Sequence, residues 1–276
     1  MTGDHATTAT TTSAVTVVPA GLGPVPLQVT VRGEGAPILL LHGGAGPVSV
    51  NGFADRLAGE RPARVHTPSH PGFDGTERPE HLTSIRQLAG VYADLLDHLD
   101  LSDVTVIGNS IGGWIAAELA LLHSTRVGRL VIIDAVGIDV PEHPIVDFFS
   151  LTLPEIADYS YADPDRYRIN PDELSPEARQ AMAGNRAALA VYGGTPSMVD
   201  PTLRDRLSGI DRPTLVVWGD ADRIAHPAIG TAYAEAIPEA QLVVMERTGH
   251  LPQIESPDRL LSVLNVFLAA TQNSPA

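Results

Sequence analysis

The chain has 276 residues, of which 43% are hydrophobic and 18% are charged, which fits one large α/β domain with a sizeable core. Its formal net charge of −15 argues against a nucleic-acid partner and against binding to an anionic membrane surface. Because the sequence contains no cysteine, disulfides, thiol nucleophiles and Cys-ligated metal sites are excluded.

The N-terminal segment has no features of a targeting signal. Residues 1–14 are rich in Thr and lack both the basic start and the apolar core of a secretory signal peptide. We expect a disordered leader over residues 1–14 and a cytoplasmic protein. No apolar run approaches the length of a membrane span, so no membrane partner is expected.

The first predicted strands form an antiparallel pair over residues 15–18 and 27–32, joined through a Gly/Pro turn. Residues 38–41 are a continuous apolar run, which is typical of a strand covered on both faces. The run leads into a glycine loop, His42-Gly43-Gly44-Ala45-Gly46, that lacks the Gly-Lys-Ser/Thr of a phosphate-binding loop. We expect His42 to hold this loop by hydrogen bonding, and the N–H of Gly44 to be free to stabilise an oxyanion.

A further strand is predicted over residues 63–67; His66 lies near its end, and His70 follows it. Their spacing could bind a metal on a helix, but Pro68 and Pro71 forbid that helix, so no metal site is predicted. Residues 84–99 have helical periodicity, with Ser84 as the expected N-cap.

The pattern Gly108-x-Ser110-x-Gly112 lies where an apolar run, residues 104–107, gives way to a helical pattern that begins at Ile111. A strand, a sharp turn and a helix in this order predict a nucleophile elbow, in which the serine has a strained backbone and an exposed hydroxyl. The turn would direct the N–H of Ile111 toward a developing oxyanion. The alternative is a glycine-rich turn with an exposed serine and no catalytic role.

A strand over residues 130–133 ends at Asp134, and the sequence then changes character over residues 137–211. This stretch is rich in Pro, Asp, Tyr and Arg and has no strand-like run, so we expect a helical lid insertion with short helices over 144–156 and 176–191. Its apolar and aromatic side chains are expected to supply part of a pocket, although ordinary packing is the alternative for each: Phe148, Phe149, Leu151, Tyr159, Tyr161, Tyr192 and Met198. The remaining chain, residues 15–136 and 212–276, would form the core domain.

Sheet structure resumes over residues 214–218 and 241–245, with helices predicted over 227–236 and 257–270. Acidic residues, Asp220 and Asp222, follow the first of these strands, and His250 follows the second. A serine nucleophile needs a base, and the base needs a third group that fixes its tautomer. The sequence offers all three at strand ends, in the chain order Ser, Asp, His.

Four separated motifs make the chain resemble the α/β-hydrolase superfamily from about residue 15 to residue 270. They are His42-Gly-Gly44, Gly108-Asn-Ser-Ile-Gly112, Trp218-Gly-Asp-Ala-Asp222 (the acid loop) and Gly249-His-Leu-Pro-Gln-Ile-Glu-Ser-Pro257 (the histidine loop). The resemblance implies a mostly parallel eight-stranded sheet flanked by helices, with a helical lid. It also implies a triad of Ser110, Asp222 and His250, with Asp220 ordering its loop and Asp134 as a minor alternative acid. The implied oxyanion donors are Gly44 and Ile111, no cofactor or metal is required, and the pocket candidates are His42, Gly43, Asn109, Phe148, Tyr192 and Leu251.

The sequence Gly-Asn-Ser-x-Gly-Gly at the elbow resembles carbon–carbon hydrolases that act on ring-fission products of aromatic degradation. In that family a Trp usually follows the catalytic His, and here the residue is Leu251. The lid of that family also carries an arginine that binds the substrate carboxylate, and Arg179 or Arg186 could be its counterpart here. The histidine loop and the lid length resemble esterases and lactonases equally well. We therefore expect a serine hydrolase of a small ester or lactone, with a carbon–carbon hydrolase, or a non-hydrolytic receptor, cyclase or lyase, as alternatives. Oligomeric state is not predicted.

Overall fold

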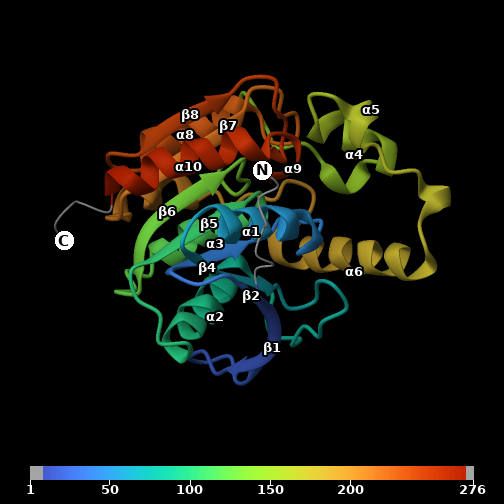
Figure 1. Ribbon diagram of the computed structural model, residues 1–276. Coiled ribbons are helices and arrows are strands. Elements are labelled where there is room, and N and C mark those ends of the chain that lie inside the picture. The colour runs from blue at the N-terminus through green and yellow to red at the C-terminus, as the bar shows by residue number, and fades with distance from the viewer. Residues whose placement is uncertain (1–8, 272–276) are drawn as a thin grey trace, which may run out of the picture.

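The computed structural model describes residues 9–271, and an eight-stranded sheet forms its centre (Figure 1). The strand order is β1-β2-β4-β3-β5-β6-β7-β8. Strand β2 runs antiparallel to both of its neighbours, and every other neighbouring pair is parallel. The strands are β1 (Thr10–Val17), β2 (Val25–Arg32), β3 (Ala36–Leu41), β4 (Ala63–Ser69), β5 (Val104–Asn109), β6 (Val127–Ile133), β7 (Thr214–Gly219) and β8 (Gln241–Met245). The predicted mostly parallel eight-stranded sheet is confirmed.

Helices flank both faces of the sheet (Figure 1). They are α1 (Val48–Glu60), α2 (Ile85–His98), α3 (Ile111–Ala120), α4 (Leu153–Ser160), α5 (Pro164–Tyr167), α6 (Pro176–Gly193), α7 (Leu203–Arg206), α8 (Pro227–Ala236), α9 (Pro252–Glu255) and α10 (Pro257–Thr271). Alternation along a strand sends successive side chains to opposite faces. In β3, Leu39 and Leu41 therefore pack in the core that includes α2, α3 and α8, whereas Ile38 and Leu40 pack in the core that includes α1 and α10.

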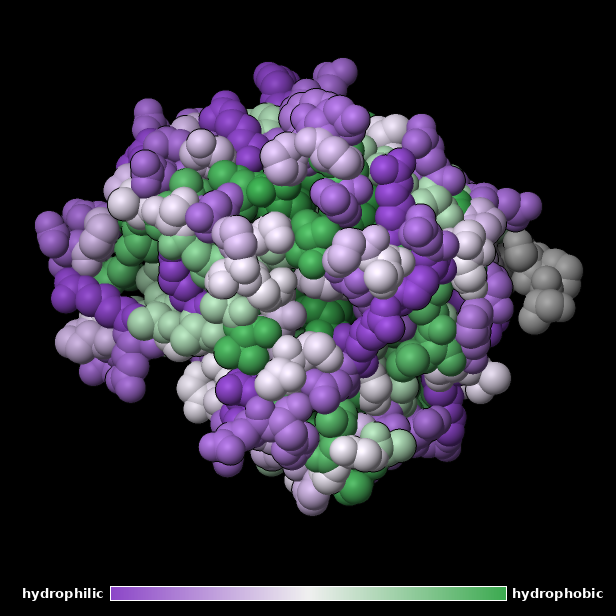
Figure 2. Space-filling view, turned by 180° about the vertical axis from the view of Figure 1, so that it is seen from behind, coloured by the Kyte–Doolittle hydropathy of each residue, from purple (hydrophilic) through white to green (hydrophobic). Residues whose placement is uncertain are grey.

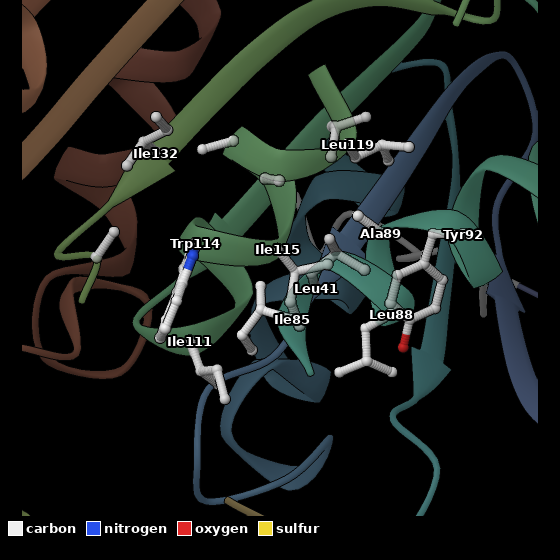
Figure 3. Packing of buried hydrophobic residues seen from close by; sticks show 14 of the residues in the cluster. Leu41, Ile85, Leu88, Ala89, Tyr92, Ile111, Trp114, Ile115, Leu119 and Ile132 are labelled. Atoms are coloured by element: carbon white, nitrogen blue, oxygen red, sulfur yellow. The ribbon is translucent and has the colours of Figure 1, made fainter. Parts of the chain in front are cut away.

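The helix of the elbow, α3, is buried along its whole length. Its residues Ile111, Trp114 and Ile115 pack in the same core as Ile85 and Leu88 of α2 (Figure 3). Helix α2 begins where the sequence predicts, because Ser84 forms a capping box with Gln87. This packing fixes the start of α3, and therefore Ser110, relative to the sheet.

The structure differs from the sequence prediction at three places. Residues 10–14, expected in the leader, belong to β1 and pair with β2, whereas residues 1–8 lie outside the described part of the chain. Five consecutive β1 residues from Thr10 are exposed, so the alternation that marks a strand is missing, and only the β-branched threonines favour one. Helix α1 is not predicted at all, and residues 144–156 contain a short 3₁₀ turn and only the start of α4 in place of the expected helix.

The segment between β6 and β7, residues 134–213, contains α4, α5, α6 and α7, and we call it the insertion. Helices α4, α5 and α6, coloured from yellow-green to yellow, lie to one side of the sheet in Figure 1. The expected helix over 176–191 is present as α6, which begins with Ser175 as its N-cap. The insertion thus leaves the sheet at the carboxyl end of β6 and returns to it at the start of the parallel strand β7.

None of the helices within residues 9–271 has both the length and the apolar composition that a membrane crossing requires. On the face of the molecule in Figure 2, hydrophobic residues are interspersed with hydrophilic ones.

Candidate active site

Ser110 lies between the end of β5 and the start of α3, with backbone angles φ 56° and ψ −122°. Positive φ is strained for a residue with a Cβ, and such strain is typical of functional turns. A Cβ at Gly108 would lie 2.1 Å from the carbonyl oxygen of Gly112, and one at Gly112 would lie 2.3 Å from that of Leu41. Both glycines are therefore required for the turn to close, and the predicted strand–turn–helix is present.

Three predicted residues form one hydrogen-bonded chain. The Ser110 Oγ lies 2.9 Å from Nε2 of His250, and Nδ1 of the same ring lies 2.8 Å from Oδ2 of Asp222. All three side chains are buried. Since a carboxylate can only accept, Nδ1 carries the proton and Nε2 is left as an acceptor for the serine hydroxyl. The arrangement makes His250 available as a base toward Ser110.

Backbone donors hold Asp222 in place from its other side. Its Oδ1 accepts the N–H groups of Ile224 and Ala225, at 2.8 and 3.0 Å. These bonds leave Oδ2 to face His250. Asp220 instead accepts the N–H of Thr248 at 3.3 Å, which agrees with the loop-ordering role expected for it.

A second carboxyl group lies beside the first. Asp134 is fully buried at the end of β6, and its Oδ1 accepts the N–H of Gly219 at 2.8 Å. Burial, reinforced by the nearby charge of Asp222, raises the pKa of Asp134 well above its ordinary value. Both causes favour the protonated form of Asp134.

Three buried side chains here could hold a metal ion, because each offers one ligand atom within 4.8 Å of the others: Asp134, Asp222 and His250. Coordination through Nδ1 would move the ring proton of His250 to Nε2. The ring would then donate to Ser110 and could not take its proton. Metal binding at these atoms and base catalysis by His250 are therefore mutually exclusive.

The glycine loop after β3 lies against the elbow. A Cβ at Gly43 would approach the Cβ of Ser110 to 3.2 Å. Within residues 9–271, no protein acceptor bonds the N–H of Gly44 or the N–H of Ile111. Both groups thus stay available to an acceptor beside the Ser110 hydroxyl, as the sequence analysis expects.

Two buried histidines support that loop from behind. His42 Nδ1 lies 2.7 Å from the carbonyl oxygen of Gly43, and its Nε2 accepts the N–H of His70 at 3.0 Å. The ring of His70 bonds the carbonyl oxygen of His42 and the hydroxyl of Tyr92. Burial lowers the pKa of His42 well below its ordinary value and that of His70 to about 4, so both rings are neutral and hold fixed tautomers.

A cavity of about 480 Å³ opens at Ser110 and His250. Gly43, Gly44, Asn109 and Leu251 line it from the core, as predicted. The insertion supplies most of the remaining wall, and most of these side chains are apolar or aromatic: Phe148, Leu151, Leu153, Ile156, Ala157, Ser160, Tyr161, Tyr167, Ile169, Leu174, Arg179, Met182, Ala183, Asn185, Arg186, Leu189 and Met198.

Two of the predicted pocket residues do not line this cavity. His42 lies behind the glycine loop and does not line the cavity. Tyr192 is also absent from the wall, because its hydroxyl is buried and donates to the carbonyl oxygen of Pro71 at 2.9 Å. Asn109 does line the cavity, but its amide bonds the carbonyl oxygen of His250 at 3.0 Å and the side chain of Gln253 at 3.1 Å.

Asn185 of α6 is a site residue that sequence reasoning misses. Its amide donates to the carbonyl oxygen of Ala45 at 2.9 Å and accepts the N–H of Asp74 at 2.8 Å. The insertion therefore holds the glycine loop directly. A single polar residue on a helix gives no sequence signal for such a contact.

The two arginines of the insertion differ in how they are bonded. One Nη of Arg186 donates to three backbone carbonyl oxygens, those of residues 148, 149 and 151, at 2.6–3.1 Å. Its guanidinium also lies over the Phe148 ring, 5.3 Å from the centroid. Arg179 bonds a single carbonyl oxygen, that of Pro171, and is exposed. Arg186 is therefore committed to the insertion, and Arg179 is the freer cation.

The model of the alpha/beta hydrolase family matches residues 38–263, and the chain belongs to that family. This match spans the glycine loop, the elbow, the acid loop and the histidine loop described above.

Among named relatives, the chain is 32% identical to the 2-hydroxymuconate semialdehyde hydrolase of Pseudomonas putida over 256 residues, which cover 86% of this chain and 89% of the relative. Among solved structures it is similar to a thermophilic esterase from Thermogutta terrifontis, with a TM-score of 0.76, 25% identity and coverage of 94% of this chain and 99% of the other. It is also similar to Est816, an N-acyl homoserine lactone degrading enzyme, with a TM-score of 0.71, 25% identity and coverage of 92% and 100%.

Proposed function

We propose that this protein is a serine hydrolase that cleaves a small, uncharged ester or lactone through an acyl-enzyme, with residues 137–211 as a lid over the site. The observation that carries the proposal is the hydrogen-bonded chain from Ser110 through His250 to Asp222, at 2.9 and 2.8 Å, at the mouth of an apolar cavity. A binding pocket alone needs no such chain.

In the proposed mechanism, His250 takes the hydroxyl proton of Ser110 as Oγ attacks the substrate carbonyl. Asp222 holds the ring in the tautomer that leaves Nε2 free and stabilises the cation that forms. His250 then gives its proton to the leaving alcohol or to the opened lactone oxygen. Water, deprotonated by the same ring, attacks the acyl-enzyme; the bond to Ser110 then breaks, His250 returns the proton to Oγ, and the acid is released.

The free N–H groups of Gly44 and Ile111 are the proposed oxyanion donors. Both are backbone groups on segments fixed by packing, so they need no rearrangement when negative charge develops on the carbonyl oxygen. Removal of one such donor typically costs about 3–4 kcal/mol of transition-state stabilisation.

An uncharged substrate is proposed because the cavity wall is mainly apolar and several of its polar side chains are bonded within the chain. Arg186, Asn109 and Asn185 all have partners within the chain. A substrate carboxylate would lose its hydration against this mainly apolar wall, where Arg179 is the less bonded of the two lining arginines. The similarity to an esterase and to a lactone degrading enzyme supports the same substrate class.

A second candidate is hydrolysis of a carbon–carbon bond in a ring-fission product. It is favoured by the relative named 2-hydroxymuconate semialdehyde hydrolase, which is 32% identical, and by the Gly-Asn-Ser-x-Gly-Gly sequence of the elbow. Arg179 would be the cation for the substrate carboxylate, since it bonds a single carbonyl oxygen, whereas one Nη of Arg186 already bonds three. In that case, Arg179→Ala raises KM for an anionic dienoate and leaves KM for a neutral ester unchanged.

The test is hydrolysis of p-nitrophenyl esters, lactones and a 2-hydroxy-6-oxo-dienoate by wild type and by Ser110→Ala. Ester or lactone hydrolysis that is lost in the variant supports the proposal, and faster turnover of the dienoate supports the second candidate. No activity and no labelling of Ser110 by a fluorophosphonate would favour a non-hydrolytic receptor, cyclase or lyase. Equal activity in both proteins would contradict the role of Ser110.

A further inference from the structure

Glu255 ends α9, close in sequence to His250, and its carboxylate accepts three backbone N–H groups. Oε2 bonds the N–H of Gly249 at 2.6 Å, and Oε1 bonds those of Ala162 and Asp163 at 2.9 and 3.2 Å. Gly249 directly precedes His250, whereas Ala162 and Asp163 lie between α4 and α5 of the insertion. One carboxylate therefore joins the histidine loop to the insertion.

Backbone contacts next to Glu255 join the same two segments. The N–H of His250 donates to the carbonyl oxygen of Ser160 at 2.7 Å. Residue 249 must be glycine for this approach, because a Cβ there would lie 2.2 Å from the same oxygen. The N–H of Arg223, the residue after Asp222, donates to the carbonyl oxygen of Tyr159 at 3.1 Å. The end of α4 thus contacts both the acid loop and the histidine loop.

We propose that Glu255 is a positioning residue that holds His250 within hydrogen-bonding distance of Ser110 by tying the histidine loop to the insertion. This inference rests on the proposed function, in which His250 is the base. The insertion then acts both as the wall of the cavity and as a support for the base. Without Glu255, three backbone donors lose their acceptor, and the loop that carries His250 is held by fewer bonds.

A carboxylate suits this position better than an amide. Both of its oxygens accept hydrogen bonds, and bonds to an ionised acceptor are about twice as strong as neutral ones. A glutamine has one acceptor oxygen, so Glu255→Gln keeps either the bond to Gly249 or the pair to Ala162 and Asp163. The expected order of activity is therefore wild type, then Glu255→Gln, then Glu255→Ala.

The experiment compares these variants with Glu246→Gln. Glu246 lies just before the same loop, and its carboxylate makes no hydrogen bond within residues 9–271. The concentration of active sites is determined by titration with a fluorophosphonate, so that unfolded protein is left out of the enzyme concentration. The parameters kcat and KM are then measured on p-nitrophenyl acetate. We expect kcat per titrated site to fall about tenfold in Glu255→Ala and less in Glu255→Gln, with KM unchanged. Glu246→Gln should match wild type.

Amide hydrogen exchange tests the hydrogen bonds themselves and does not depend on activity. Peptides that cover residues 160–164 and 247–251 should exchange faster in both Glu255 variants than in wild type. An unchanged kcat per titrated site, or unchanged exchange in both peptides, would overturn the inference. An inactive wild type that the fluorophosphonate does not label would contradict the proposed function, and exchange would then still decide whether Glu255 joins the two segments.

Discussion

Asp134 and Asp222 follow neighbouring strands of the sheet, and their carboxyl groups lie within 4.8 Å of each other. Both are buried, and burial together with the Asp222 charge raises the pKa of Asp134 well above its ordinary value. The folded protein therefore favours the protonated form of Asp134, within 4.8 Å of a ring nitrogen of His250. That relationship has a measurable effect on stability.

Replacement of Asp134 by asparagine should stabilise the protein increasingly as pH rises. The unfolded chain releases the Asp134 proton near pH 4, whereas the folded protein keeps it, so wild type loses stability at about 1.4 kcal/mol per pH unit up to the raised pKa. Asparagine keeps the shape and the bond to Gly219 and has no proton to lose. Urea unfolding of Asp134→Asn and wild type at pH 5 and pH 8 measures the effect. If the free energies of unfolding of the variant and of wild type differ by the same amount at both pH values, Asp134 is ionised in the folded protein.

Asp222→Asn should keep the fold and lose most of the activity. The amide can donate its N–H to Nδ1, which would place the ring proton on Nε2 and leave Ser110 without a base. We expect kcat on p-nitrophenyl esters to fall about 10³- to 10⁴-fold. Asp220→Asn is the matched control. Within residues 9–271 the Asp220 carboxylate accepts only the loop N–H of Thr248, so kcat of this variant should stay within a few-fold of wild type.

Gly108→Ala should destabilise the chain by about 3 kcal/mol or more, because the new Cβ would lie 2.1 Å from backbone at Gly112. Gly90→Ala is the control. Gly90 lies within α2, where an added Cβ would meet no atom within 4 Å, and the variant should gain about 0.5–1 kcal/mol from the helix propensity of alanine. Denaturant unfolding of both variants measures the two effects. Similar stability changes in the two would contradict the close approach at the elbow.

Asn185→Ala should impair both stability and catalysis. It leaves the carbonyl oxygen of Ala45 and the N–H of Asp74 without partners, at a cost of about 1–3 kcal/mol, and it releases the loop that carries Gly44. We expect a lower kcat per titrated site on p-nitrophenyl acetate. Gln180→Ala, an exposed change on the same helix, should stay within about 0.5 kcal/mol of wild type and keep its kcat. A normal kcat in Asn185→Ala would mean that the glycine loop does not need this support.

The fold and the Ser110–His250–Asp222 arrangement could be predicted because each residue follows a strand with a strong local signal. Parallel strands bring their carboxyl ends to one edge, so residues that follow three strands meet there. Contacts made by the insertion had no such signal. The bonds of Asn185 and Glu255 depend on how α4 and α6 fold back over the sheet, and no periodicity in the sequence encodes that path. Helix α1 was missed because it follows the glycine loop without a capping side chain and contains Gly52.

The insertion supplies backbone acceptors at Tyr159 and Ser160 to the acid and histidine loops, and α6 bonds the glycine loop. Substrate range in such a protein cannot be re-engineered by transplanting this segment from a relative as an independent module. In a chimera, residues 249 and 255 of the recipient would have to fit the backbone of the transplanted segment. The transplanted segment would also need a residue that replaces the contacts of Asn185. Only then could the new pocket be combined with a working base. Directed evolution of the pocket should therefore favour single side-chain changes on the cavity wall over exchange of the whole segment.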